Sequence, residues 1–401
     1  MKHVLNVWDR KKSYGFREIL FRLSLRRRAF SALLLTSLFI PTLHAQNNLP
    51  IIKANSVDVD IEEDNVLRKK AWKIDPQQKL DVFGTSAKKV TFYTDIDKFT
   101  VHIGRGKKQD FIILLNGKDS AMTRIQYEPS RLHILKGAAK YNFSDNRPVP
   151  TFTYQSAEHP DLKRIRAELK LDSIAGKGDE LTKIFNLMYW VHNLIQHDGN
   201  STNPTIKNAI DLIKVCQKEK RGINCRMLAI ILNECYLAMG IKSRYITCMP
   251  KELEFQDCHV INMVYSQDLD KWIWIDPTFA AYVMDENGTL LGIQEVRERL
   301  INGKPLILNA DANWNREAQQ TKDGYLKTYM AKNLYRLETP VESKYNAETW
   351  NMVKEIEYVE LLPLDALEQT PQRTEEVNNK TGVKFVYYKT NNPNLFWTKP
   401  Q

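Results

Sequence analysis

The sequence predicts an α+β protein, in which a small β-rich domain precedes a larger domain of helices packed on an antiparallel sheet. Apolar residues recur with period two before residue 160, then at helical spacing to about residue 240, and strand-like runs follow the helices. The chain has 401 residues, of which 43% are hydrophobic and only 16 each are Gly and Pro. This composition excludes collagen-like, disordered and multi-span membrane proteins.

Residues 1–45 are predicted to be a secretory signal peptide. Residues 1–28 contain nine basic and two acidic residues, and an uncharged stretch with an apolar centre at 32–40 follows. A basic region, a short apolar core and a Leu-x-Ala site are typical of such a leader, with cleavage expected after Ala45. A transmembrane anchor is the alternative, but the apolar core is shorter than the roughly 20 residues that span a bilayer.

The leader also contains most of the net charge. The chain carries a formal charge of +10, from 58 Lys and Arg against 48 Asp and Glu, and seven of these ten charges lie in the leader. No basic stripe interleaved with aromatic residues indicates a nucleic-acid partner. We therefore expect an exported protein, in the periplasm, at the cell surface or secreted, with no stable membrane anchor after cleavage.

Residues 46–160 are predicted to form the β-rich domain, most simply a sandwich. Apolar and polar residues alternate at 90–92 and 99–103, and the apolar run 111–115 ends at an Asn-Gly turn. Residues 132–143 add further residues of the types that favour strands. We expect no chemistry in this domain.

Residues 161–340 are predicted to form the second domain, which begins with helices. A charged helical stretch at 161–171 precedes amphipathic helices at 181–195, 206–218 and 224–240. The elements expected after them are strands at 243–249, 259–265 and 271–275, a helix near 294–300 and a long helix at 316–335. In the remaining residues, 341–401, we expect strands at 357–362 and 382–388, a polar loop at 368–380, and packing on the preceding domains.

All five cysteines lie between residues 216 and 258. No pair has the C-x2-C spacing of a zinc site, so a structural metal is not expected. An odd number of cysteines in an exported protein leaves at least one free thiol. Cys216 and Cys235 lie on apolar helix faces and should be buried and inert, whereas Cys248 and Cys258 flank a loop between two strands and could form a disulfide.

Cys225 is the candidate nucleophile. It lies in the first turn of the helix predicted at 224–240, directly after Asn224, a residue that suits an N-cap. The unpaired N–H groups and the positive end of the helix dipole favour a thiolate at this position.

His259 and Asp276 are the candidate partners of this thiol. The strands at 259–265 and 271–275 are expected to form a hairpin, and if Tyr265 pairs with Asp270, His259 lies directly opposite Asp276. Opposed Cβ atoms are about 5 Å apart, so the carboxylate would fix the imidazole tautomer and stabilise its protonated form. His197, in a loop, is the rival histidine. The simpler alternative is an ordinary polar pair at a sheet end and an inert Cys225.

Four sequence blocks resemble the core of the transglutaminase-like superfamily. They are Gly222-Ile223-Asn224-Cys225-Arg226, Met239-Gly240-Ile241-Lys242-Ser243-Arg244-Tyr245, Cys258-His259-Val260-Ile261-Asn262-Met263 and Trp272-Ile273-Trp274-Ile275-Asp276-Pro277-Thr278. The resemblance covers residues 161–306 and implies a papain-like fold. In that fold Cys225 would be the nucleophile, His259 the general base and acid, and Asp276 the orienting carboxylate. Asn224 and Arg226 depart from the family pattern, since many members carry a smaller residue before the cysteine and an acidic or polar one after it.

The resemblance implies a thiol acyl-transfer enzyme that acts on peptide or protein amide bonds, with no metal or organic cofactor. Water would resolve the thioester in a hydrolase, and an amine in a transamidase. The backbone N–H of Cys225 and the loop 197–203 are candidates for the oxyanion donors. Two alternatives remain, a catalytically silent module that binds a surface protein or glycan, and a redox thiol protein, which the missing C-x2-C pair disfavours.

Overall fold

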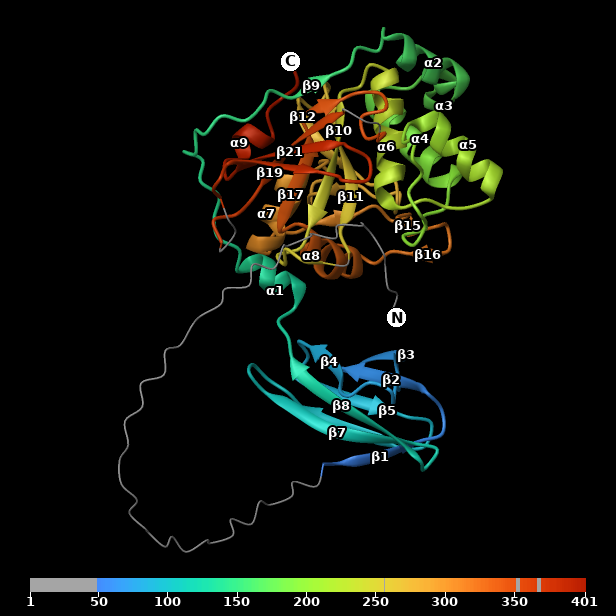
Figure 1. The fold of residues 1–401 in the computed structure, drawn as a ribbon, viewed down its shortest axis with the longest axis vertical. Coiled ribbons are helices and arrows are strands. Elements are labelled where there is room, and N and C mark those ends of the chain that lie inside the picture. Colours follow the sequence, from blue (N-terminus) through green and yellow to red (C-terminus); the bar gives the residue numbers. More distant parts are fainter. Residues whose placement is uncertain (1–48, 256, 351–353, 366–368) are drawn as a thin grey trace, which may run out of the picture. The chain divides into compact units, whose positions relative to one another are not determined.

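The structure is a computed structural model that describes residues 49–401 except residues 256, 351–353 and 366–368. The predicted signal peptide, residues 1–45, lies outside the described residues. The chain divides into two compact units, with the boundary between Glu128 and Pro129 (Figure 1). No helix in the described part of the chain is both long enough and apolar enough to cross a membrane.

The first unit is a β-sandwich. Its described residues form two four-stranded sheets, with strand orders β1-β7-β8-β4 and β3-β2-β5-β6. The strands are β1 (Ile51–Ala54), β2 (Asp58–Glu63), β3 (Val66–Lys73), β4 (Asp81–Thr85), β5 (Lys89–Tyr93), β6 (Lys98–His102), β7 (Lys108–Leu115) and β8 (Asp119–Tyr127). The alternating apolar side chains, among them Phe92 and Phe111, fill the core of the unit. The predicted sandwich is therefore present, although it ends earlier than expected.

Residues 129–160 belong to the second unit, so the predicted boundary at residue 160 is displaced. The strand-like residues after Leu132 form a helix instead, α1 (Arg131–Lys136). Ser130 caps this helix, because its Oγ accepts a hydrogen bond from the backbone N–H of His133 at 3.2 Å. Leu135 is buried in the core of the second unit. A local cap and tertiary burial thus override the strand propensity of the segment.

The second unit is built on a seven-stranded sheet within the described residues, in the order β12-β11-β10-β17-β19-β21-β20. These strands are β10 (Ser243–Met249), β11 (His259–Ser266), β12 (Lys271–Ile275), β17 (Arg336–Pro340), β19 (Glu355–Leu361), β20 (Arg373–Val377) and β21 (Lys384–Thr390). The C-terminal strands therefore continue the sheet that carries the predicted hairpin. The polar loop predicted at 368–380 is partly wrong, because β20 forms there. It is a largely exposed edge strand, which needs no apolar alternation.

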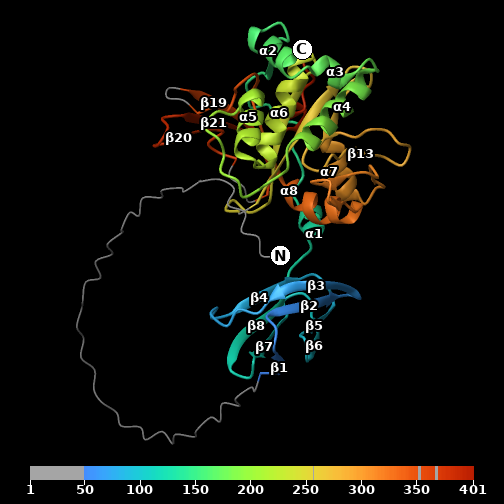
Figure 2. The ribbon, with the colours of Figure 1, turned by 90° about the vertical axis from the view of Figure 1, so that its right-hand side faces the viewer.

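Helices cover both faces of this sheet (Figure 2). One face packs on α2 (Pro160–Glu168), α3 (Leu171–Ala175), α4 (Glu180–Leu194), α5 (Ala209–Glu219) and α6 (Cys225–Ala238). The other packs on α1, α7 (Ile293–Asn302), η1 (Asp323–Met330), α8 (Ala331–Asn333) and α9 (Pro393–Phe396). Along β11, Val260 and Val264 enter the first core, and Ile261 and Met263 enter the second. Burial on both faces explains why the strand is almost continuously apolar.

The long helix predicted at 316–335 starts later in the structure. A hairpin of β15 (Asn313–Trp314) and β16 (Ala318–Gln319) comes first, and Asn315 and Arg316 have positive φ angles of 55° and 62° at its turn. A left-handed pair cannot continue a right-handed helix, so helical structure begins only at η1. The remaining short strands are β9 (Thr153–Tyr154), β13 (Val283–Met284), β14 (Ile307–Leu308) and β18 (Glu342–Ser343).

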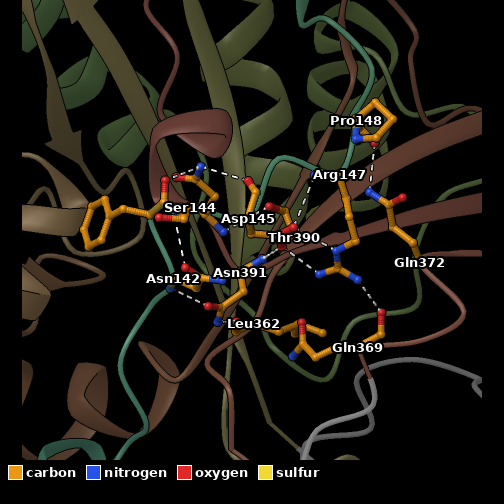
Figure 3. Close-up of polar contacts among 12 residues, drawn as sticks. Asn142, Ser144, Asp145, Arg147, Pro148, Leu362, Gln369, Gln372, Thr390 and Asn391 are labelled. Atoms are coloured by element: carbon orange, nitrogen blue, oxygen red, sulfur yellow. Dashed lines mark hydrogen bonds and ion pairs between the residues drawn. The ribbon is translucent and has the colours of Figure 1, made fainter.

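A partly buried polar cluster joins the segment after α1 to the end of β21 (Figure 3). The Asp145 carboxylate pairs with the guanidinium of Arg147 at 2.7 Å and accepts a hydrogen bond from the backbone N–H of Asn391 at 3.1 Å. Arg147 also donates to the carbonyl of Gln369 at 2.8 Å. The Arg147 hydrogen bonds lower the pKa of Asp145 to about 2, although burial opposes this shift. The two ends of the second unit are thus held together.

Candidate active site

Cys225 is the first residue of α6, as predicted. The Asn224 side chain caps the helix by accepting a hydrogen bond from the backbone N–H of Met227 at 3.2 Å. Its amide nitrogen donates to Asn203 Oδ1 at 2.6 Å, which holds the cap against the preceding loop. Gly222 allows this close approach, because a Cβ atom there would lie 2.5 Å from the Gln196 carbonyl oxygen. The fold thus places the Cys225 thiol at the positive end of a capped helix.

His259 and Asp276 form a hydrogen bond, with 2.7 Å between His259 Nε2 and Asp276 Oδ2. His259 is the first residue of β11 and Asp276 directly follows β12, so both lie at the same end of the hairpin. The predicted register is nevertheless wrong by two residues, because Tyr265 pairs with Trp272 rather than with Asp270. A shift of two residues keeps a side chain on the same face, so the two groups meet as diagonal neighbours.

Helix α4 accounts for the observed register. The Glu180 carboxylate accepts hydrogen bonds from Ser266 Oγ at 2.6 Å and from the backbone N–H groups of Gln267 and Asp268 at 3.0 and 3.2 Å. These contacts place residues 267–270 in the turn. They come from a helix nearly 90 residues earlier, which the pattern of the two strands does not contain.

Asp276 is fully buried and held by several donors. Its Oδ1 accepts a hydrogen bond from the backbone N–H of Thr278 at 2.9 Å, and its Oδ2 accepts one from the hydroxyl of Tyr325 at 2.6 Å. The indole N–H of Trp274 in turn donates to the Tyr325 oxygen at 3.2 Å. Tyr325, on η1, was not among the predicted site residues. This network fixes the orientation of the carboxylate and, through it, that of the His259 ring.

The Cys225 thiol lies beside two imidazoles, those of His259 and His197. Burial alone would raise the pKa of this thiol, but His197 and His259, through hydrogen bonds and through their charges, lower it to about 6. Burial likewise opposes the charged form of His259, but the Asp276 carboxylate and Cys225 raise the pKa of the imidazole to about 10. The two pKa values are therefore ordered as a thiolate–imidazolium pair requires.

The other thiols differ from Cys225. All five cysteines are free, so the predicted disulfide between Cys248 and Cys258 is wrong. Cys248 pairs with His259, the residue that follows Cys258. Neighbouring residues along a strand point to opposite faces, so the side chain that faces Cys248 is not that of Cys258. Burial raises the thiol pKa of Cys216, Cys235, Cys248 and Cys258. Of the five cysteines, only Cys225 has a thiol pKa that is lowered.

Residues 167–277 match the family model of the transglutaminase-like superfamily. This segment is a transglutaminase-like core. It contains Cys225, His259 and Asp276, and the second unit adds the rest of the sheet around it. No curated protein sequence matches the chain.

Three solved structures show a limited likeness to the chain. A candidate cysteine protease from Cytophaga hutchinsonii is 23% identical over 32% of this chain and 40% of its own, with a TM-score of 0.25. LapG from Legionella pneumophila is 14% identical over 46% of this chain and 98% of its own, also with a TM-score of 0.25. Red sea bream transglutaminase is 13% identical over 58% of this chain and 49% of its own, with a TM-score of 0.22. The chain thus spans less than half of the first of these structures.

Arg226, next to Cys225 in the transglutaminase-like core, points away from the site. Its guanidinium is 3% exposed, and it pairs with Glu348 at 3.0 Å and with Glu338 at 3.7 Å. It also donates to Thr247 Oγ1 at 3.0 Å. The departure from the family pattern at this position is therefore a buried ion network that ties α6 to the sheet.

Aromatic rings cover His259 in the transglutaminase-like core. Phe279 and Tyr329 pack edge-on against the imidazole, with ring centroids 5.5 and 5.2 Å away. Cys225 is only 5% exposed and His259 is fully buried. In the described residues, no cluster of three or more His, Cys, Asp or Glu side chains could hold a metal ion.

Proposed function

We propose that the protein is a thiol acyl-transfer enzyme that acts on amide bonds of peptides or proteins, with Cys225 as nucleophile, His259 as general acid and base, and Asp276 as the orienting carboxylate. The observation that carries the proposal is the His259–Asp276 hydrogen bond beside a helix-terminal thiol whose pKa is lowered. The four other thiols of the chain lack this environment.

The reaction divides into two steps. The Cys225 thiolate attacks the amide carbonyl carbon, the carbonyl π electrons move to oxygen, and the tetrahedral intermediate collapses with cleavage of the C–N bond. His259 gives its proton to the leaving amine, which leaves a thioester on Cys225. His259 then takes a proton from water or from an acceptor amine as that group attacks the thioester, and the thiolate is released. Water yields an acid, and an amine yields a new amide.

The context of the reaction is also part of the proposal. We propose that residues 1–45 direct export and that the enzyme works in the periplasm, at the cell surface or outside the cell. Hydrolysis of a peptide or protein amide is favoured for an exported enzyme of this kind, and transamidation is the alternative outcome of the same thioester.

Burial of the site supports a rival function. Cys225, His259 and Asp276 are each at most 5% exposed, and Phe279 and Tyr329 cover the imidazole. A closed site would also suit a catalytically silent module that binds a surface protein or glycan. Reactivity of the thiol separates the two functions, because a silent module does not require a thiolate.

Alkylation of Cys225 tests the proposal. We expect iodoacetamide to label the native protein at Cys225 with an apparent thiol pKa near 6, located by mass spectrometry of the modified peptide. His259→Ala should move this pKa towards the ordinary value of about 8.5, because the imidazolium is lost. Slow labelling with an ordinary or raised pKa in both proteins would favour the silent module.

The fate of the thioester needs a second measurement. Ammonia release from a glutamine-containing peptide, with and without a primary amine, distinguishes side-chain amide chemistry from backbone cleavage. Incorporation of the amine identifies a transamidase, and new peptide termini identify a protease. Cys225→Ser and Asp276→Asn serve as controls for each activity.

A further inference from the structure

We propose that His197 supplies the side-chain donor of the oxyanion hole, through an Nε2–H whose position on the ring is set by the indole of Trp314. This inference rests on the proposed thiol acyl-transfer function, and it gives that reaction a second imidazole with a different task from that of His259.

Backbone pairing places His197 beside the nucleophile. His197 forms a parallel bridge with Ile223, two residues before Cys225. The Ile223 N–H donates to the Gln196 carbonyl at 3.2 Å, and the Asp198 N–H donates to the Ile223 carbonyl at 2.9 Å. The side chain then reaches the Cys225 thiol, whose pKa it lowers. The imidazole therefore lies next to the sulfur that a substrate carbonyl would approach.

A hydrogen bond from Trp314 determines the tautomer of His197. The Trp314 indole Nε1 lies 3.1 Å from His197 Nδ1, and an indole N–H can only donate. Nδ1 must therefore carry a lone pair, so the proton of the neutral ring lies on Nε2. If Nδ1 were also protonated, its N–H would point at the indole N–H of Trp314, and two donors would face each other. The Trp314 contact thus leaves Nε2–H as the donor of His197, whereas Asp276 stabilises the imidazolium form of His259.

The β15–β16 hairpin holds His197 through its backbone as well. Asn315 Oδ1 accepts a hydrogen bond from the His197 N–H at 2.7 Å, and Asn315 Nδ2 donates to the His197 carbonyl at 3.0 Å. The Trp314 ring also packs edge-on against the imidazole, with centroids 6.4 Å apart. Two neighbouring residues of one hairpin therefore fix both the position and the hydrogen-bonding state of this side chain.

An imidazole N–H in this position suits an oxyanion donor. When the thiolate attacks, negative charge moves from sulfur to the carbonyl oxygen, and a fixed donor beside the sulfur can follow that charge. Neutral imidazole is a known electrophilic donor in enzyme sites. The backbone N–H of Cys225, one of the orphan donors of the α6 first turn, would supply the other half of the hole.

Two reagents that react with the same thiol separate this role from a merely structural one. Iodoacetamide alkylates the thiolate by displacement and forms no oxyanion, whereas p-nitrophenyl acetate acylates it through a tetrahedral oxyanion. The rate of each reaction is measured against pH, and its limiting value is taken where the thiol is fully ionised. The ratio of the limiting acylation rate to the limiting alkylation rate then does not depend on the thiolate fraction. The variants are His197→Phe, a ring without a donor, His197→Gln, a donor without the ring, and Trp314→Phe, which keeps the ring contact but removes the indole N–H. Cys225→Ser defines the background.

Loss of one oxyanion donor typically lowers the rate on the order of 100-fold or more. We therefore expect His197→Phe to reduce the ratio by about that factor, His197→Gln to recover part of it, and Trp314→Phe to cause a smaller loss. An unchanged ratio in folded His197→Phe would overturn the inference and leave the function intact. If His197→Phe does not fold, an unchanged ratio in both His197→Gln and Trp314→Phe has the same meaning. A wild-type Cys225 that neither reagent modifies refutes the proposed function itself.

Discussion

Cys225 lies beside two imidazoles that have different hydrogen-bond partners. His259 is buried against Asp276, which favours the imidazolium, whereas His197 accepts the Trp314 indole N–H at Nδ1. His259 Nε2 is engaged by Asp276, and Cys225 lies beside the same ring. The thiol thus has one partner suited to proton transfer and another suited to donation without proton transfer.

The pH dependence of acylation follows from the two shifted pKa values. The reactive form needs Cys225 deprotonated and His259 protonated. The Cys225 pKa is lowered to about 6 and the His259 pKa is raised to about 10, so the p-nitrophenyl acetate burst should rise through about pH 6 and fall through about pH 10. Asp276→Asn should move the upper limb to lower pH, because the negative charge that raises the His259 pKa is lost. A single rise near pH 8.5–9 would contradict this assignment.

Tyr325→Phe tests the network behind Asp276. The substitution removes the hydroxyl that donates to Asp276 Oδ2 and leaves the Trp274 indole N–H without its acceptor. We expect a loss of about 1.5–3 kcal/mol in the free energy of unfolding, since hydrogen bonds to charged groups contribute that much. Acylation should fall on the order of tenfold, because the orientation of Asp276 is less strongly fixed.

Tyr335→Phe is the matched control for Tyr325→Phe. Tyr335 is also buried in the second core, and its hydroxyl makes no hydrogen bond in the described part of the chain. Urea unfolding and acylation should change little in this variant. Equal effects in the two variants would show that the Tyr325 hydroxyl has no specific role.

The residues of the site were only partly predictable from sequence. Cys225 was recognisable from its helix start, and His259 and Asp276 from one hairpin, because these signals are local. Tyr325 and Trp314 act from segments well after the hairpin, on η1 and β15. The sequence pattern placed Tyr325 in the long helix at 316–335 and Trp314 in no predicted element. No local signal connects them to Cys225, because tertiary packing alone brings them there.

At the scale of elements, η1 and the β15–β16 hairpin shape the site. Residues of η1 contact both His259 and Asp276, because Tyr325 donates to Asp276 and Tyr329 packs on His259. The hydrogen bonding of η1 is π-helical, which is rare and frequently occurs at functional sites. The register of β11 and β12 also depends on an element distant in sequence, because Glu180 on α4 holds the turn between these two strands.

Gly222→Ala tests the packing of the loop against the start of α6. The added Cβ would lie 2.5 Å from the Gln196 carbonyl oxygen and 3.0 Å from Asp198 Cβ, so backbone must move. Overpacking of this kind costs roughly 1–3 kcal/mol. Because residues 196–198 carry His197, we expect slower acylation as well as a lower unfolding midpoint.

Gly137→Ala is the control for Gly222→Ala, in the same unit. Its Cβ would meet its nearest neighbours only at 3.5 Å, and the φ angle is −83°. Thermal unfolding and the acylation burst should be close to wild type. A Gly222→Ala protein that behaves like this control would refute the close approach.

At the scale of the whole molecule, the C-terminal strands complete the unit that holds the site. Arg226, the residue after Cys225, pairs with Glu338 on β17 and with Glu348 in the segment that leads to β19. The same carboxylate of Glu348 accepts hydrogen bonds from Tyr245 on β10 and Tyr358 on β19, each at 2.8 Å. The sequence suggested that residues 341–401 pack on the core, but it could not show that they extend its sheet and share a buried ion network with α6.

Truncation tests whether the transglutaminase-like core needs these strands. We expect a fragment of residues 129–401 to unfold in one cooperative transition and to keep the rapid alkylation of Cys225. A fragment of residues 161–340, the domain expected from sequence, lacks Glu348, Tyr358 and the strands that cover β17. Removing one partner of a buried ion pair costs about 3–5 kcal/mol, which is a large part of the roughly 5–15 kcal/mol that stabilises a typical domain.

The shorter fragment should therefore show no cooperative transition by near-ultraviolet circular dichroism, and iodoacetamide should modify all of its cysteines alike. A third fragment, residues 161–401, keeps the ion network but lacks α1 and the Asp145–Arg147 pair that contacts Asn391 and Gln369. It should still fold, because the sheet and the Arg226 partners are intact. Its stability should be reduced, because α1 and the Asp145–Arg147 pair are missing. Native alkylation and cooperative unfolding of residues 161–340 alone would mean that the C-terminal strands are dispensable for the site.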